Sequence, residues 1–142
     1  MKFEIFIDKE CEERVIVYAH EKTKLTDAIQ QLVTETDTLI GYNGKQYVKL
    51  SFADVYCFIV EENKVFALTE SERLQLKSRL YNLEEITPES FVKINQSCII
   101  DTNKVERFDA SVSGTLLVKL KNGYRDYVSR RNLKKVKERF GI

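Results

Sequence analysis

The stretch GTLLVKLKNGYRDYVSRRNLKKV, residues 114–136, carries the clearest structural signals in the chain. Residues 116–120 and 124–128 are apolar, strand-like runs on either side of Asn122-Gly123, a dipeptide typical of tight hairpin turns. Ser129 then suits the N-cap of a helix whose apolar residues recur three and four positions apart. The stretch therefore predicts a β-hairpin followed by a basic C-terminal helix.

Upstream of this hairpin the chain is also rich in short strand-like runs. Asn43-Gly44 predicts another two-residue hairpin turn, and the apolar spacing around residues 79–85 predicts a short helix. The further predicted strands are residues 39–42, 45–50, 55–60, 65–69, 73–77, 91–94, 98–100 and 105–108. The fold class expected is mainly β, of the α+β kind.

The first 37 residues show a different order of elements. Apolar and polar residues alternate over residues 2–7, and residues 14–19 are rich in Val, Ile and Tyr, so both predict strands. Leu25, Ile29, Leu32 and Val33 then fall on one face of a helix between residues 20 and 37. We expect a β-β-α segment over 1–37, holding a dimer or regulatory contact, ahead of a β-rich body over 38–142.

Composition places the chain among ordinary globular proteins of the cytoplasm. It is 43% hydrophobic and 32% charged, which argues against disorder. The charged N-terminus predicts no secretory signal, and the longest apolar run, 55–60, is too short to cross a bilayer. Cys11, Cys57 and Cys98 form no CxxC pair and lie in apolar surroundings, so we expect three buried free thiols.

Charge is distributed unevenly along the chain. Residues 1–90 hold 11 basic and 17 acidic side chains, a net charge of −6. Residues 91–142 hold 12 basic and 5 acidic side chains, a net charge of +7. A chain polarised in this way has one end suited to a polyanion and another end that is not.

Motifs of catalytic and cofactor sites are missing from the sequence. It contains no GxxxxGK[ST], GxGxxG or GxSxG pattern, and the single histidine, His20, has no nearby Cys/His set that would hold zinc. We therefore expect no enzyme activity, no cofactor, no metal and no small-molecule substrate.

Three segments together resemble the LytTR family of DNA-binding domains. They are DVYCFIVEENKVFAL (54–68), FVKINQSCIIDTNKV (91–105) and the 114–136 stretch. The family pattern F-x-R-I-x-x-S is matched by residues 91–97, and its V-S-R-R helix start by residues 128–131. The whole chain is similar to stand-alone LytTR regulators, which lack a receiver domain and carry a short β-β-α segment instead.

The resemblance implies a bacterial transcription regulator. The family fold is an elongated stack of small antiparallel β-sheets with short helices, whose loops enter successive major grooves of double-stranded DNA. Family members usually recognise direct repeats, which implies a homodimer, at least on DNA. Many similar stand-alone members are regulated by a membrane-protein inhibitor, so such an inhibitor is a candidate partner here.

The resemblance also indicates which residues contact DNA. Paired amide groups and the guanidinium fork match the edges of adenine and guanine, so the base-reading candidates are Asn63, Lys64, Asn95, Gln96 and Arg131. The candidates for phosphate contacts are Lys93, Ser97, Ser129, Arg130, Lys134 and Lys135. Two residues depart from the family: Lys93 stands where Arg is common, and Asp101 where Asn is common. Asp101 is unfavourable near phosphate, so we expect it to face away from DNA or to cap a turn.

Other interpretations of the same residues stay open at this point. Asn95-Gln96 suits a simple turn, and Arg130-Arg131 suits a solvated helix start. The chain as a whole also fits a non-catalytic adaptor of a signalling system whose basic end is only surface. A small enzyme with acid/base carboxylates far apart in the sequence is the second alternative.

Overall fold

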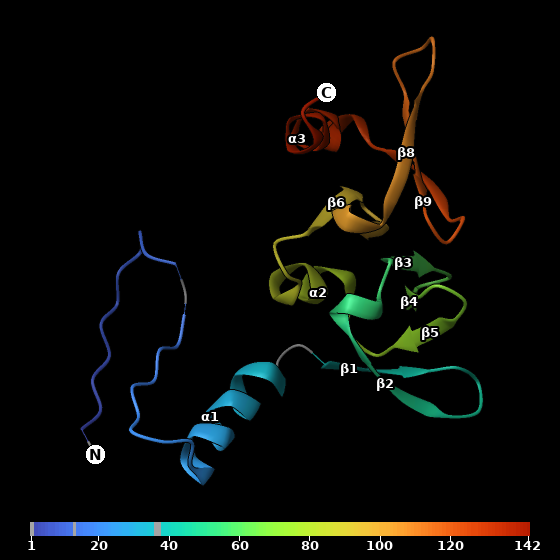
Figure 1. Cartoon of the computed structure of the whole chain (residues 1–142). Coiled ribbons are helices and arrows are strands. Elements are labelled where there is room, and N and C mark those ends of the chain that lie inside the picture. Colours follow the sequence, from blue (N-terminus) through green and yellow to red (C-terminus); the bar gives the residue numbers. More distant parts are fainter. Residues whose placement is uncertain (1, 13, 36–37) are drawn as a thin grey trace. The chain divides into compact units, whose positions relative to one another are not determined.

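A computed structural model of the chain describes residues 2–12, 14–35 and 38–142 (Figure 1). The chain divides into two compact units, 1–36 and 37–142, and each is described by itself. Within the described residues, no helix is both long enough and apolar enough to span a membrane.

The described residues of the first unit form one helix, α1 (Lys24–Glu35). Thr23 and Thr26 begin it reciprocally: the Thr26 amide donates to Thr23 Oγ1 at 3.3 Å, and the Thr23 amide to Thr26 Oγ1 at 2.8 Å. Ahead of α1 the described residues form no strand, so the two strands predicted over 2–7 and 14–19 are not present. Their apolar side chains have no sheet to join and remain exposed.

The second unit is an antiparallel β structure with short helices, and it confirms the expected fold class. Seven of its strands form one sheet in the order β2-β1-β5-β4-β3-β7-β6, and three form another in the order β10-β9-β8. The strands are β1 (Thr38–Tyr42), β2 (Tyr47–Ser51), β3 (Cys57–Glu61), β4 (Lys64–Leu68), β5 (Arg73–Leu76), β6 (Phe91–Asn95), β7 (Cys98–Asp101), β8 (Val105–Ala110), β9 (Leu116–Leu120) and β10 (Arg125–Val128). The helices are α2 (Leu80–Ile86) and α3 (Arg130–Phe140), with 3-10 turns at Phe52–Asp54 and Thr102–Lys104.

The two Asn-Gly dipeptides each lie in a four-residue loop between their strands, residues 43–46 and 121–124. Tyr42 pairs with Tyr47, so the β1–β2 loop has four residues, and the two-residue turn predicted at Asn43-Gly44 is wrong. The Asn43 side chain explains the longer loop, because its Oδ1 accepts the amides of residues 45 and 46 at 2.9 and 2.8 Å. The β9–β10 hairpin forms where it was predicted, with Gly123 at the positive φ of 93° that its turn requires.

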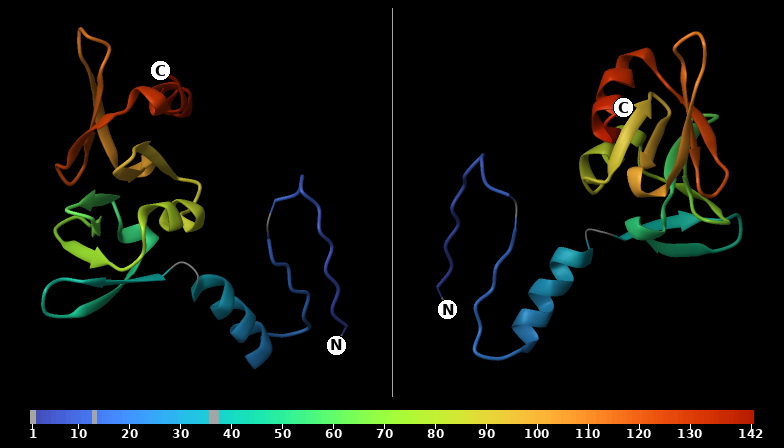
Figure 2. Two further views of the ribbon diagram at one scale, coloured as in Figure 1. Left: turned by 180° about the vertical axis from the view of Figure 1, so that it is seen from behind. Right: turned by 45° about the horizontal axis from the view of Figure 1, so that its top comes forward.

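The large sheet is buried on both faces because side chains alternate along its central strands. In β3, Phe58 faces a core with α2, while Cys57 and Ile59 face a second core with the small sheet and α3. The views in Figure 2 agree with Figure 1 in placing α3 beside the β8–β9 hairpin, at the end of the unit away from β1 and β2. The second core therefore fixes α3 against the body of the unit.

Two sequence expectations about buried polar groups have different outcomes. Asp101 is buried and caps the 3-10 turn that follows β7, accepting the Asn103 amide at 3.0 Å, as expected. Cys57 and Cys98 are buried free thiols, and a hydrogen bond from the Cys98 thiol to Cys57, together with burial, raises the pKa of Cys98. Cys11 is exposed, which corrects the expectation that all three thiols are buried.

Candidate nucleic-acid interface

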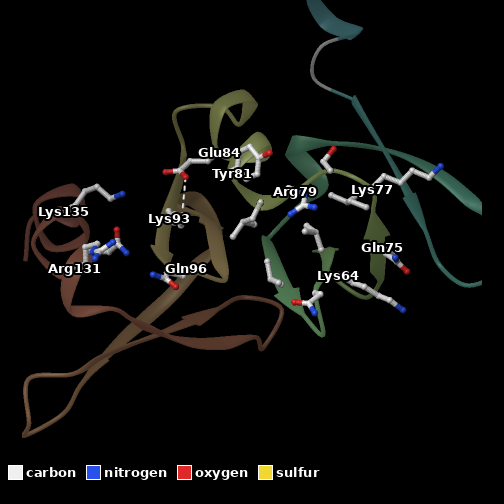
Figure 3. A pocket seen from close by; sticks show the side chains of 17 residues that line it. Lys64, Gln75, Lys77, Arg79, Tyr81, Glu84, Lys93, Gln96, Arg131 and Lys135 are labelled. Atoms are coloured by element: carbon white, nitrogen blue, oxygen red, sulfur yellow. Dashed lines mark ion pairs between the residues drawn. The ribbon is translucent and has the colours of Figure 1, made fainter.

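Three loops that are far apart in the sequence gather around one concavity of the second unit (Figure 3). They are the β3–β4 turn, the β6–β7 loop and the start of α3. The concavity measures about 1030 Å³, and its polar lining includes Asn63, Lys64, Gln75, Lys77, Arg79, Tyr81, Glu84, Lys93, Gln96, Arg131, Asn132 and Lys135. Figure 3 shows Arg131 and Lys135 on one side and Lys64 and Lys77 on the other.

The β3–β4 turn presents Asn63 at its tip. Glu61 pairs with Lys64, so the turn consists of Glu62 and Asn63, whose φ angles are 53° and 63°. Two consecutive left-handed residues define the type I′ hairpin, the turn that best matches the twist of its strands. Asn tolerates this conformation, whereas Glu62 is strained in it. The turn holds an exposed amide at the rim of the concavity.

Asn95, a predicted base-reading residue, makes two hydrogen bonds within the chain at the β6–β7 loop. The Asn95 Nδ2 donates to the Tyr127 carbonyl at 2.8 Å, and its Oδ1 accepts the Ser97 amide at 2.8 Å. These two bonds hold the loop, and each end of the amide keeps one further donor or acceptor, so the base-reading role of Asn95 stays a prediction. Gln96 is exposed and lines the concavity, so its amide is available to a ligand.

The start of α3 is hydrogen-bonded to the end of β6, next to the β6–β7 loop. The Ser129 amide donates to the Ile94 carbonyl at 2.8 Å, and Ser129 Oγ caps the helix by accepting the Asn132 amide at 3.3 Å. Val136, fully buried, anchors the inner face of α3 in the second core. Arg131 and Lys135 lie one turn apart on the face that lines the concavity.

Positive charge dominates the concavity. Its lining contains six cationic side chains, and Glu84 is its single carboxylate. Lys93 Nζ lies 3.6 Å from Glu84 Oε2, a partly screened ion pair. Within the described part of the chain, no ion pair is seen for the other five cations: Lys64, Lys77, Arg79, Arg131 and Lys135. Such a surface attracts a polyanion.

The concavity contains part of the predicted DNA-contacting set. Six of those residues line it: Asn63, Lys64, Lys93, Gln96, Arg131 and Lys135. The other five lie outside its lining: Asn95, Ser97, Ser129, Arg130 and Lys134. Lys77 and Arg79 also line it and were missed, because no local pattern separates them from ordinary surface cations. Only the fold identifies them, because β5 pairs with β4 and so brings residue 77 beside the β3–β4 turn.

Metal-ligand chemistry finds no support in the described residues. They contain no group of three or more His, Cys, Asp or Glu side chains placed to hold an ion.

The chain matches known proteins over its full length. The model of the LytTr DNA-binding domain matches residues 45–141. A Staphylococcus aureus protein from strain MSSA476, named an uncharacterized HTH-type transcriptional regulator, is 33% identical over 100% of this chain and 99% of its own length. A similarly named protein from strain NCTC 8325 is 32% identical with the same coverage. A helix-turn-helix consists of two helices joined by a short turn. Among the described residues of this chain, strands separate each helix from the next.

A solved structure shares the fold of most of this chain. It is the LytTr DNA-binding domain of a Bacillus cereus protein described as a methyl-accepting/DNA response regulator. The two superpose with a TM-score of 0.70 at 20% sequence identity, over 75% of this chain and 98% of that one.

Proposed function

This chain belongs to the LytTR DNA-binding domain family, and on that basis we propose that it is a sequence-specific transcription regulator that binds double-stranded DNA. The observation that carries the proposal is the concavity, where three loops from distant parts of the sequence bring together amides and unpaired cations. Amides and guanidinium groups read base edges, and cations neutralise phosphates. The concavity offers both kinds of group on one face.

Base reading is assigned to the exposed residues at the rim. Arg131 offers a donor fork that fits guanine O6 and N7 in the major groove, and the amides of Gln96 and Asn63 fit adenine N6 and N7. Lys64, beside Asn63, offers a single donor that suits either guanine acceptor. We assign the loops on the two sides of the concavity to successive stretches of the major groove. The DNA backbone between these stretches then crosses the concavity.

Phosphate contact is assigned to the cations around these readers. Lys93 and Lys135 face the concavity, and Lys77 and Arg79 extend the same charge along the opposite wall. Outside the lining, the exposed cations of α3 and the polar groups near its N-terminus add contacts to the flanking backbone. These residues are Ser97, Ser129, Arg130 and Lys134.

The oligomeric state, cellular location and regulation proposed for this protein are those typical of its family. Two copies bind two direct repeats as a homodimer on DNA, in the bacterial cytoplasm, and a membrane-protein inhibitor is the proposed regulator. The protein acts by occupying its site, without catalysis. DNA binding of this kind needs no cofactor.

Selection of bound oligonucleotides from a random duplex pool tests the proposal. The full chain should enrich a motif present twice in the same orientation. Its affinity should fall steeply with salt, since each neutralised phosphate contributes about 0.9 to the slope of log K against log salt. Failure to enrich any motif, together with a flat salt response, would overturn the proposal and favour an adaptor.

A further inference from the structure

The concavity contains one side chain that opposes the charge of DNA. Among the described residues that line it, Glu84 of α2 is the one acid, beside six cations. A carboxylate repels phosphate, so Glu84 lowers the affinity of this surface for a DNA backbone unless a cation neutralises it.

The fold holds the Glu84 carboxylate next to Lys93. The Lys93 Nζ lies 3.6 Å from Glu84 Oε2, and Figure 3 shows this ion pair between α2 and β6. Val92 and Ile94, on either side of Lys93 in β6, are buried in the second core, so the Lys93 backbone is fixed while its flexible four-carbon stem can turn. Both members of the pair line the concavity. The Lys93 ammonium can therefore turn from Glu84 to a ligand that enters there.

Glu84 and a DNA phosphate offer Lys93 the same kind of acceptor. Carboxylate and phosphate oxygens both accept charge-assisted hydrogen bonds from an ammonium group. Contact between Lys93 and DNA therefore exchanges one ion pair for another. Within the described part of the chain, no ion pair is seen for the other five cations of the lining, so their contacts with phosphate need no such exchange.

We propose that Glu84 is an internal competitor of DNA phosphate for Lys93, and that it lowers the affinity of the concavity for any DNA backbone. The inference rests on the DNA-binding function proposed above. When DNA enters, the Lys93 ammonium leaves Glu84 for a phosphate, and the loss of the ion pair subtracts from the binding free energy. Because phosphate contacts carry no sequence information, selected and unselected DNA are weakened alike. Glu84 thus limits the attachment to unselected DNA that charge alone provides.

Glu84→Gln in the full-length chain tests the exchange, and Glu85→Gln is the matched control. Gln has nearly the helix propensity of Glu, and Glu85 is an exposed residue of α2 outside the lining of the concavity. In fluorescence anisotropy at low salt, Glu84→Gln should lower the dissociation constant about three- to fivefold for selected and scrambled duplexes, the effect of releasing a partly exposed ion pair. Glu85→Gln makes the same change in net charge and should stay within about 1.5-fold of the parent.

The double variant Glu84→Gln/Lys93→Gln shows whether Glu84 acts through Lys93. Compared with Lys93→Gln alone, it should change the dissociation constant by less than about 1.5-fold, because no ammonium is left to release. A gain as large as that of Glu84→Gln in the parent would overturn the proposal, since Glu84 would then act on DNA directly.

The remaining outcomes separate this proposal from its alternatives. Equal gains in Glu84→Gln and Glu85→Gln overturn it, because net charge then explains both. A loss of affinity for the selected duplex alone also overturns it and makes Glu84 a base reader that accepts from the cytosine amine. A parent chain that binds neither duplex refutes the DNA-binding function itself. A parent that binds DNA, with no gain from Glu84→Gln, refutes only the competition at Lys93.

Discussion

Two segments with the same alternating pattern have opposite fates in this chain. Residues 116–120 become β9, with both edges paired, by β8 and β10, and with residues 116, 118 and 120 buried. Residues 2–7 alternate as regularly, yet they form no strand and stay exposed. Alternation thus indicates that a segment can be a strand, but pairing partners decide whether it is one. The described residues of the first unit therefore lack the strand pairing that the second unit provides for its own segments.

The largest predicted effect contrasts Phe58 with Phe3. Phe58 is fully buried between Phe52 and Phe91, so Phe58→Ala should lower the free energy of unfolding by about 3–5 kcal/mol. Phe3→Ala should change it by less than about 0.5 kcal/mol, because Phe3 contributes nothing to that core. Urea denaturation of both variants, followed by far-UV circular dichroism, measures the contrast. Equal losses would show that the first unit is packed as tightly as the second.

The same contrast marks what the sequence could predict. In the second unit the strands and helices lie within about two residues of their predicted bounds, because turn residues separate short apolar runs there. The pairings β1–β5 and β3–β7 could not be predicted, since they join segments whose proximity no local pattern encodes. In the first unit the same rules predicted two strands that do not form.

The candidate site was predictable only in part for the same reason. Arg131 and Gln96 stood out through the family pattern, and the structure brings them to one concavity. The hydrogen bond between Asn95 and the Tyr127 carbonyl could not be predicted, because the two residues are 32 positions apart in the sequence. Lys77 and Arg79 were missed because only the β4–β5 pairing places them at the site. The sequence thus identifies the types of residue that suit a DNA contact, but it does not show which of them lie close together in the fold.

The second prediction compares basic side chains of the two units. Arg131→Ala should weaken binding to the selected DNA by about 1–3 kcal/mol and relax one base position. Arg14→Ala removes an exposed arginine from the first unit and should leave binding unchanged. Lys134→Ala should weaken selected and scrambled DNA alike and lower the salt slope by about 1. Fluorescence anisotropy over a salt series measures all three.

Two results would contradict these assignments. If Arg131→Ala discriminated selected from scrambled DNA as the parent does, Arg131 would be no base reader. A selective loss in Lys134→Ala would make Lys134 a base-reading residue instead of a phosphate contact.

The third prediction concerns pH and contrasts Tyr124 with Tyr18. Burial, with Cys98 and Asp126 nearby, raises the pKa of Tyr124 well above its ordinary value, and its hydroxyl donates to Asp126 Oδ2 at 3.0 Å. The pKa of tyrosine in an unfolded chain is about 10. The stability that the Tyr124 hydroxyl provides is therefore complete below that pH, and it is lost as the pH rises toward the pKa of Tyr124 in the folded chain. Tyr124→Phe should therefore cost about 1 kcal/mol at pH 8 and have a shrinking effect above pH 10.

The control for this prediction is Tyr18→Phe, because the Tyr18 side chain is 93% exposed in the first unit. Urea midpoints at pH 8 and near pH 11 compare the two variants with the parent. A constant difference between Tyr124→Phe and the parent across this range would show that the Tyr124 hydroxyl ionises as readily when folded as when unfolded.

The smallest predicted effect tests backbone strain at the β3–β4 turn. Glu62 holds a φ of 53°, which costs a residue with a long side chain more than it costs Asn. Glu62→Asn should therefore stabilise the chain by about 0.5–1 kcal/mol, whereas Glu12→Asn, an identical exchange in the exposed first unit, should be neutral. The exchange also removes an acid next to Asn63, so DNA affinity should rise modestly in low salt. If stability rose equally in both variants, loss of negative charge would explain the gain, and the strain assigned to this turn would contribute nothing.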